Sequence, residues 1–77
     1  DYYAEEASIY VRQQKYEDAL KSIERAIAIA PDFGACYRLR GVCYVRLKKK
    51  TEACEAFNKA KELADPLAGK LIKEHCK

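Results

Sequence analysis

The chain has 77 residues, roughly half of the ~150 that serve as a length prior for one domain, so it is too short for two independent hydrophobic cores. Hydrophobic residues make up 49% and charged residues 35% of the chain, a composition too apolar for intrinsic disorder. A chain of this size also has little room for a deep enzyme pocket, and its apolar runs are far shorter than a membrane span requires. The sequence therefore predicts one small folded unit.

Charge is divided unevenly along the chain. The net charge is +3, but residues 1–33 carry seven acidic and four basic side chains, whereas residues 34–77 carry five acidic and eleven basic ones. A basic second half favours either an acidic partner or head-to-tail contact with the acidic end of a second copy.

Hydrophobic spacing predicts a helical hairpin in the first part of the chain. Apolar residues recur at i, i+4, i+7 and i+8 within residues 3–11 and within residues 19–30, and no stretch alternates with period two. The polar segment 13–15 separates the two patterns, and Pro31 ends the second one. Two helices joined by a short turn follow from this arrangement.

The second part of the chain shows the same organisation. Apolar spacing predicts helices within residues 37–45 and 53–64, with the basic segment 48–50 as the turn between them. A fifth, short helix follows, for which Asp65 is a suitable N-cap and Pro66 a suitable first-turn residue. This helix has an apolar side formed by Leu67, Leu71, Ile72 and Cys76, and a basic side formed by Lys70, Lys73 and Lys77.

An internal repeat relates the two hairpins. When the sequence is shifted by 34 residues against itself, eight positions carry the same amino acid. The identical pairs are Tyr3 and Tyr37, Tyr10 and Tyr44, Val11 and Val45, Arg12 and Arg46, Lys15 and Lys49, Ala19 and Ala53, Ala26 and Ala60, and Ala30 and Ala64. A period of this length indicates stacked helix-turn-helix units.

The chain resembles the tetratricopeptide repeat family over essentially its whole length. The residues that carry the resemblance are Tyr3, Ala7, Tyr10, Ala19-x3-Ile23, Ala26 and Pro31 in the first unit, and Tyr37, Gly41, Tyr44, Ala53-x3-Phe57 and Ala60 in the second. Glu6 and Arg40 depart from the pattern, which has Leu at both places, and Pro66 comes one residue later than Pro31 predicts. The resemblance implies an all-α fold, in which the helical hairpins form an α-α superhelix (solenoid).

This resemblance also implies the organisation of the unit. Residues 1–33 and 34–65 are expected to be two repeats, and residues 66–77 a C-terminal capping helix, together forming one domain. Ala7 and Gly41 are expected to be buried where the two helices of each hairpin approach most closely, because small residues allow that approach.

Four cysteines, at positions 36, 43, 54 and 76, are separated by 7, 11 and 22 residues. These separations match neither a Cys-x-x-Cys zinc pattern nor a dense disulfide scaffold. Cys36 and Cys43 share one helical face, on which cysteine packs as a small hydrophobe. All four are interpreted as free thiols, with a Cys54–Cys76 disulfide and metal or redox chemistry as the alternatives.

No catalytic motif is present in the sequence. There is no Gly-rich phosphate loop, no His-Glu-x-x-His and no nucleophile elbow, and the adjacent His75 and Cys76 do not share a helical face. We therefore predict no enzyme activity, no cofactor and no metal site.

The family resemblance places the function on a surface. Related proteins bind a peptide or helix in a concave groove that is lined by the first helix of each hairpin. Mapped by the repeat period, the partner-binding residues here are Arg12, Arg38, Val42, Val45, Arg46 and Lys73, with Lys70 and Lys77 on the same wall. An apolar strip edged by basic side chains favours an acidic, partly apolar peptide or helix of a partner protein.

Other readings of the surface stay open at this point. The basic run 46–50 with six tyrosines fits nucleic-acid binding, and the chain also fits the purely structural end of a longer repeat array. Self-association through the uncapped N-terminal face is a further expectation, whereas a membrane partner is not expected. Free thiols and the lack of a signal peptide in this segment favour the cytoplasm, although a chain that begins at Asp1 says nothing about the parent's targeting signals.

Overall fold

The computed structural model describes residues 2–76, so that Asp1 and Lys77, the last residue of the predicted groove wall, lie outside the described residues. Within this range there are five helices and no strand, which confirms the all-α prediction. The helices are α1 (Tyr2–Arg12), α2 (Tyr16–Ile29), α3 (Gly34–Arg46), α4 (Lys50–Glu62) and α5 (Ala68–His75).

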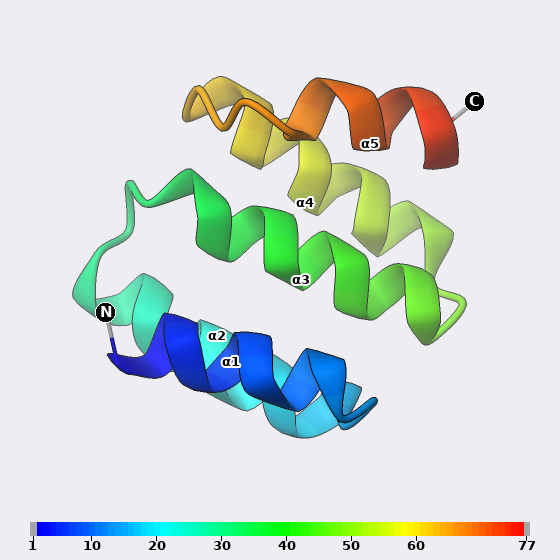
Figure 1. The fold of residues 1–77 in the computed structure, drawn as a ribbon. Coiled ribbons are helices and arrows are strands. Elements are labelled where there is room, and N and C mark those ends of the chain that lie inside the picture. Colours follow the sequence, from blue (N-terminus) through cyan, green and yellow to red (C-terminus); the bar gives the residue numbers. More distant parts are fainter. Residues whose placement is uncertain (1, 77) are drawn as a thin grey trace.

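The helices pack as two hairpins followed by a single helix (Figure 1). α1 packs on α2, α3 packs on α4, and the α2–α3 contact joins the two hairpins, whereas α5 packs on α4. In Figure 1, α1, α3 and α5 form the near layer, and α2 and α4 lie behind them. The near layer is therefore built from the first helix of each hairpin together with α5.

Small side chains allow the hairpins to pack closely. The central cluster consists of the fully buried residues Ala7, Ala19, Ile23, Ala26, Cys36 and Cys43. Phe57 of α4 is the largest fully buried side chain, and it lies against Gly41 of α3. The predicted burial of Ala7 and Gly41 is confirmed.

Glu6 departs from the repeat pattern because it has polar partners. Its carboxylate accepts a hydrogen bond from Ser22 Oγ at 2.6 Å and one from the Tyr2 hydroxyl at 3.3 Å. Ser22 is buried, and this bond satisfies its hydroxyl. The negative charge of Glu6 raises the pKa of Tyr2 above its ordinary value. The equivalent residue of the second repeat, Arg40, instead lies over the ring of Tyr44.

Three helices end with a non-glycine residue at positive φ. Gln14, Lys48 and Ala64 have φ values of 64°, 62° and 65°. After α4, the Ala64 N–H donates to Lys61 O at 2.9 Å and the Asp65 N–H donates to Ala60 O at 3.0 Å. This pair of bonds is the Schellman motif, whose left-handed position favours glycine because it lacks a Cβ.

Glycine at this position should stabilise the protein. We expect Ala64→Gly to raise the free energy of unfolding by about 0.5–1 kcal/mol, because it removes the Cβ clash at positive φ. Ala30→Gly is the matched control, since Ala30 is the repeat equivalent but has a φ of −135°. Urea unfolding followed by circular dichroism measures both effects, and an equal change in the two variants would contradict the explanation.

The start of α5 differs from the sequence-based expectation. Asp65 was the predicted N-cap, but α5 begins at Ala68 and its N-cap position is Leu67. The Asp65 carboxylate accepts the Leu67 N–H at 3.2 Å, and its Oδ2 lies 3.0 Å from Arg38 Nε. Asp65 therefore organises the turn that leads into α5 and does not occupy the N-cap position, because the helix begins three residues later at Ala68.

Candidate partner-binding groove

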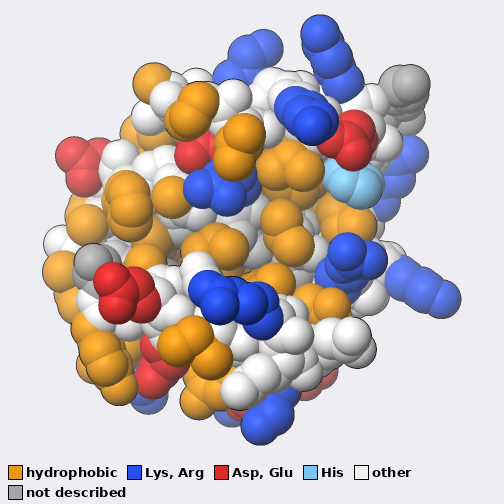
Figure 2. Space-filling model, in the orientation of Figure 1, with side chains coloured by type: hydrophobic (Ala, Val, Ile, Leu, Met, Phe, Trp, Pro, Cys, Tyr) orange, Lys and Arg blue, Asp and Glu red, His pale blue; other side chains and the backbone are white. Residues whose placement is uncertain are grey.

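A hollow of about 170 Å³ lies between α3 and α5. Val42 and Val45 of α3 face Leu71 of α5 across it, and all three side chains are half-buried. Phe57 of α4 lies at the base of the hollow, where it is fully covered. Figure 2 shows hydrophobic side chains gathered in this part of the face formed by α1, α3 and α5. The hollow therefore has apolar walls that are partly open to solvent.

Basic side chains border the hollow. Arg46, in the last turn of α3, is exposed and lines its rim. A neighbouring hollow of about 400 Å³ shares Val45 and His75 with the first and adds Lys48, Lys50, Ala53 and Glu74. Figure 2 shows Lys and Arg side chains around the apolar area. The turn between α3 and α4 is therefore part of the rim of the groove.

The predicted site residues are only partly brought together. Val42, Val45 and Arg46 line one hollow, whereas Arg12 and Lys73 are exposed side chains that stand outside its lining. Arg38 is half-buried and is bonded through Nε to Asp65 within the same chain. It therefore links α3 to the segment before α5 and is not among the side chains that line the hollow.

Three lining residues were missed by the sequence analysis. Phe57 was considered only as part of the repeat pattern, Leu71 only as part of the apolar side of the fifth helix, and His75 only as a neighbour of Cys76. Leu71 and His75 are spaced i, i+4, a signal that places both on one face of α5. His75 stacks on Phe57 with ring centroids 6.0 Å apart and an interplanar angle of 26°.

Comparison with known proteins decides the family. A family model for the tetratricopeptide repeat matches residues 5–68, most of the chain. The chain belongs to the tetratricopeptide repeat family. A DnaJ homolog subfamily C member 3 homolog from Dictyostelium discoideum is 44% identical over 55 residues, which cover 66% of this chain and 11% of that protein. No solved structure matches the chain.

Membership of this family assigns a general role to the fold. Tetratricopeptide repeats mediate protein–protein interactions, and stacked helical repeats present extended concave surfaces for them. Among residues 2–76, no group of three or more His, Cys, Asp or Glu side chains is placed to bind a metal ion. Within the same residues, no helix has the length and apolar character needed to cross a membrane.

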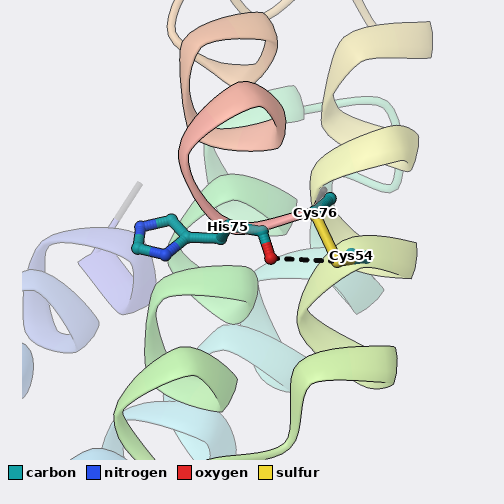
Figure 3. Close-up of a disulfide and its surroundings, with 3 residues drawn as sticks. All are labelled: Cys54, His75 and Cys76. Carbon is teal, nitrogen blue, oxygen red and sulfur yellow. Dashed lines mark hydrogen bonds between the residues drawn. A yellow bond between two sulfur atoms is a disulfide. The ribbon is translucent and has the colours of Figure 1, made fainter.

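The interpretation of all four cysteines as free thiols is wrong for two of them. Cys54 of α4 and Cys76, which follows α5, form a disulfide with a Cα–Cα distance of 5.7 Å (Figure 3). Their pairing removes the free-thiol argument for the cytoplasm, since disulfides persist mainly in oxidising compartments. Cys36 and Cys43 are free and fully buried in this tetratricopeptide repeat core. Burial raises the pKa of the Cys36 thiol and raises that of Cys43 to about 11.

Proposed function

We propose that this chain is a protein-interaction module whose α3–α5 groove binds an acidic, partly apolar peptide or helix. The observation that carries the proposal is the combination of an apolar hollow and a basic rim. Val42, Val45 and Leu71 supply contact area, while Arg46 with the neighbouring Lys48 supplies positive charge. Arg12 and Lys73 are exposed on α1 and α5 outside the hollow, and in this proposal they add positive charge beyond its rim.

Charge and apolar area have different roles in this proposal. Burying an apolar segment of the partner against the valines gives a gross gain of about 25 cal/mol per Å² of buried apolar area, which offsets part of the entropy lost on association. The exposed Arg46 can form a bidentate pair with a carboxylate, and rim charges of this kind chiefly speed association and select the partner. An acidic segment with apolar anchors satisfies both features, whereas a purely acidic segment leaves the apolar floor exposed.

Charge reversal tests the groove. We expect the double variant Arg12→Glu with Arg46→Glu to bind a synthetic amphipathic peptide of glutamate and leucine at least about tenfold more weakly than wild type. The reason is that two attractive rim charges become repulsive towards the peptide's carboxylates. Fluorescence anisotropy of the labelled peptide measures the change, and circular dichroism confirms that helicity is retained.

A matched double variant controls for net charge. Lys21→Glu with Lys61→Glu makes the same change on exposed residues of α2 and α4, the helices behind the groove layer. This variant should keep peptide binding within about twofold of wild type, because its charges are remote from the groove and partly screened by salt. An equal loss in both double variants would contradict a groove site and indicate binding by net charge alone.

We further propose that a second copy of the chain packs against the outer face of α1. On this face Tyr2 is 71% and Ile9 49% exposed, and both line a hollow of about 330 Å³ with Glu5 and Glu6. Their repeat equivalents in α3, Cys36 and Cys43, are fully buried. The acidic rim of this face and the basic second half of the chain are complementary in charge.

Sedimentation velocity over a concentration series tests self-association. The weight-average mass of wild type should rise with concentration, and Ile9→Lys should abolish the rise because it adds a positive charge that repels the basic end of the second copy. Ile29→Lys is the control, since Ile29 is also an exposed apolar residue but belongs to α2. A wild-type chain that stays monomeric at the highest concentration would contradict this proposal.

A further inference from the structure

α5 is fastened to the rest of the molecule at both ends. At its start, the Arg38–Asp65 ion pair of 3.0 Å holds the preceding turn to α3. At its end, the Cys54–Cys76 disulfide joins the residue after α5 to the middle of α4 (Figure 3). The bond closes a loop across a sequence separation of 22 residues. The disulfide and the ion pair therefore hold opposite ends of one short helix.

Between these fastenings, α5 is sparsely packed. Only Ala68 is fully buried, Leu71 and Ile72 are half-buried, and a Cβ at Gly69 would meet no atom within 4 Å. A helix of eight residues is also unstable on its own, because the free-energy cost of helix nucleation exceeds the stabilisation from so few backbone hydrogen bonds. The position of α5 therefore depends strongly on how its ends are held.

The last turn of α5 covers part of the apolar floor of the groove. The His75 ring stacks on Phe57, which is fully buried, and Figure 3 shows this ring pointing away from the disulfide. His75 and Leu71 also form the α5 wall of the hollow that contains Val42. If the last turn of α5 moves away from α4, Phe57 loses its cover and the hollow widens.

We propose that the Cys54–Cys76 disulfide is a redox-sensitive clasp that sets the width of the α3–α5 groove. When the clasp is oxidised, the last turn of α5 stays over Phe57. When it is reduced, that turn detaches from α4 and exposes a larger apolar surface. The opening of α5 stands on the geometry alone, and only its consequence for partner binding rests on the proposed groove function.

The disulfide is accessible to a reductant. Cys54 and Cys76 are half-buried and line an open hollow of about 540 Å³ on the side of α5 away from His75, together with Lys50 and Ile72. A dithiol can therefore reach the sulfur atoms without prior unfolding of the chain.

Reduction by a dithiol proceeds in two balanced steps. A thiolate of the reductant attacks one sulfur, so that the S–S bond breaks, a mixed disulfide forms and the other cysteine leaves as a thiolate that takes up a proton. The second thiolate of the reductant then displaces the remaining cysteine, which is protonated in turn. Two electrons pass to Cys54 and Cys76, which become thiols, and the reductant becomes a cyclic disulfide.

The reduced state keeps only a weak substitute for the bond. Cys54 Sγ lies 3.8 Å from the carbonyl oxygen of His75. In the disulfide this sulfur carries no hydrogen, so it cannot donate a hydrogen bond to that oxygen. After reduction the Cys54 thiol can donate to this carbonyl, but a thiol is a weak donor. The contact therefore orients the released thiol and does not replace the covalent link.

Amide hydrogen exchange measured by NMR on the full chain, with and without dithiothreitol, tests the clasp. Amides of α5, such as the Cys76 N–H bonded to Ile72 O, should exchange at least about tenfold faster after reduction, because the loop constraint is lost. Amides of α1–α3 should keep their rates. Fluorescence of 8-anilinonaphthalene-1-sulfonate should rise as apolar surface is exposed.

Two controls accompany this measurement. Cys54→Ser with Cys76→Ser should show the reduced pattern whether or not dithiothreitol is present. Iodoacetamide should label Cys54 and Cys76 of the reduced native chain but leave Cys36 and Cys43 unmodified, since those thiols are buried and burial raises their pKa. Labelling of all four cysteines would show general unfolding.

Two results would overturn the clasp. Unchanged exchange in α5 after complete reduction would show that packing alone holds the helix. Uniform loss of protection in all five helices would show that the bond stabilises the whole unit and not one element. Failure of the glutamate–leucine peptide to bind in either redox state, with α5 still responding to reduction, would contradict the groove function and leave the clasp supported.

Discussion

Gly41→Ala should lower the free energy of unfolding by about 1–3 kcal/mol, because the added methyl group collides with a buried ring. A Cβ at this position would lie 2.5 Å from Cδ1 and 2.9 Å from Cζ of Phe57, distances at which one of the groups has to move. Phe57 is fully buried, so its ring cannot relax into solvent. Urea unfolding followed by circular dichroism measures the loss.

The internal repeat supplies a matched control for this prediction. In the first repeat, Ala7 stands at the position of Gly41 and Ile23 at the position of Phe57. The first hairpin therefore packs alanine, which is larger than glycine, against isoleucine, which is smaller than phenylalanine. Gly41→Ala with Phe57→Ile should therefore be more stable than Gly41→Ala alone.

A second control tests whether the cost at Gly41 is steric. Gly69→Ala should stabilise the protein by about 0.5–1 kcal/mol, because its Cβ meets no neighbour and alanine favours a helix over glycine. A Gly41→Ala chain as stable as wild type would mean that α3 and α4 do not cross closely at this point.

Arg38→Ala should lower the free energy of unfolding by about 1.5–3 kcal/mol, because it leaves a nearly buried carboxylate without its charged partner. The Asp65 side chain is 5% exposed and the Arg38 side chain 26% exposed, so water compensates the loss poorly. Asp65 also accepts the Leu67 N–H, and we expect the amides at the start of α5 to exchange faster in this variant. Urea unfolding and amide exchange measure the two effects.

Arg46→Ala is the natural control for Arg38→Ala. Arg46 belongs to the same helix and its loss changes the net charge equally, but it is exposed, so its removal should alter stability by less than about 0.5 kcal/mol. Equal destabilisation by the two variants would contradict a specific role for the Arg38–Asp65 pair. Because Arg38 pairs with Asp65, its substitution is expected to change stability as well as binding. Arg12 and Arg46 are therefore better positions for testing the groove.

Local patterns in the sequence were sufficient to predict the helices and the repeat. Apolar spacing of 3.6 residues and the matches at an offset of 34 predicted helical hairpins, and residues 2–76 contain five helices arranged accordingly. Burial of Ala7 and Gly41 followed from the same register, because close helix packing requires small residues at repeating positions. These features depend on neighbours along the chain or one repeat away.

The cysteine prediction failed because pairing depends on distance in space. Cys54 and Cys76 are 22 residues apart in sequence, and no spacing rule says that their Cα atoms come within 5.7 Å. That distance results from the packing of α5 on α4, which brings the end of α5 next to the middle of α4. Cys36 and Cys43 were correctly placed in the core, since a seven-residue spacing fixes a common helical face.

The sequence by itself determined the helical class, the repeat register and the family of this chain, because hydrophobic period and small-residue positions are local properties. Only the tertiary structure decided which side chains meet between elements. It placed His75 on Phe57, joined Arg38 to Asp65 and brought Leu71 opposite Val42. These contacts depend on where the capping helix lies against α3 and α4, a position that is set by long-range packing and one disulfide and not by any pattern along the chain.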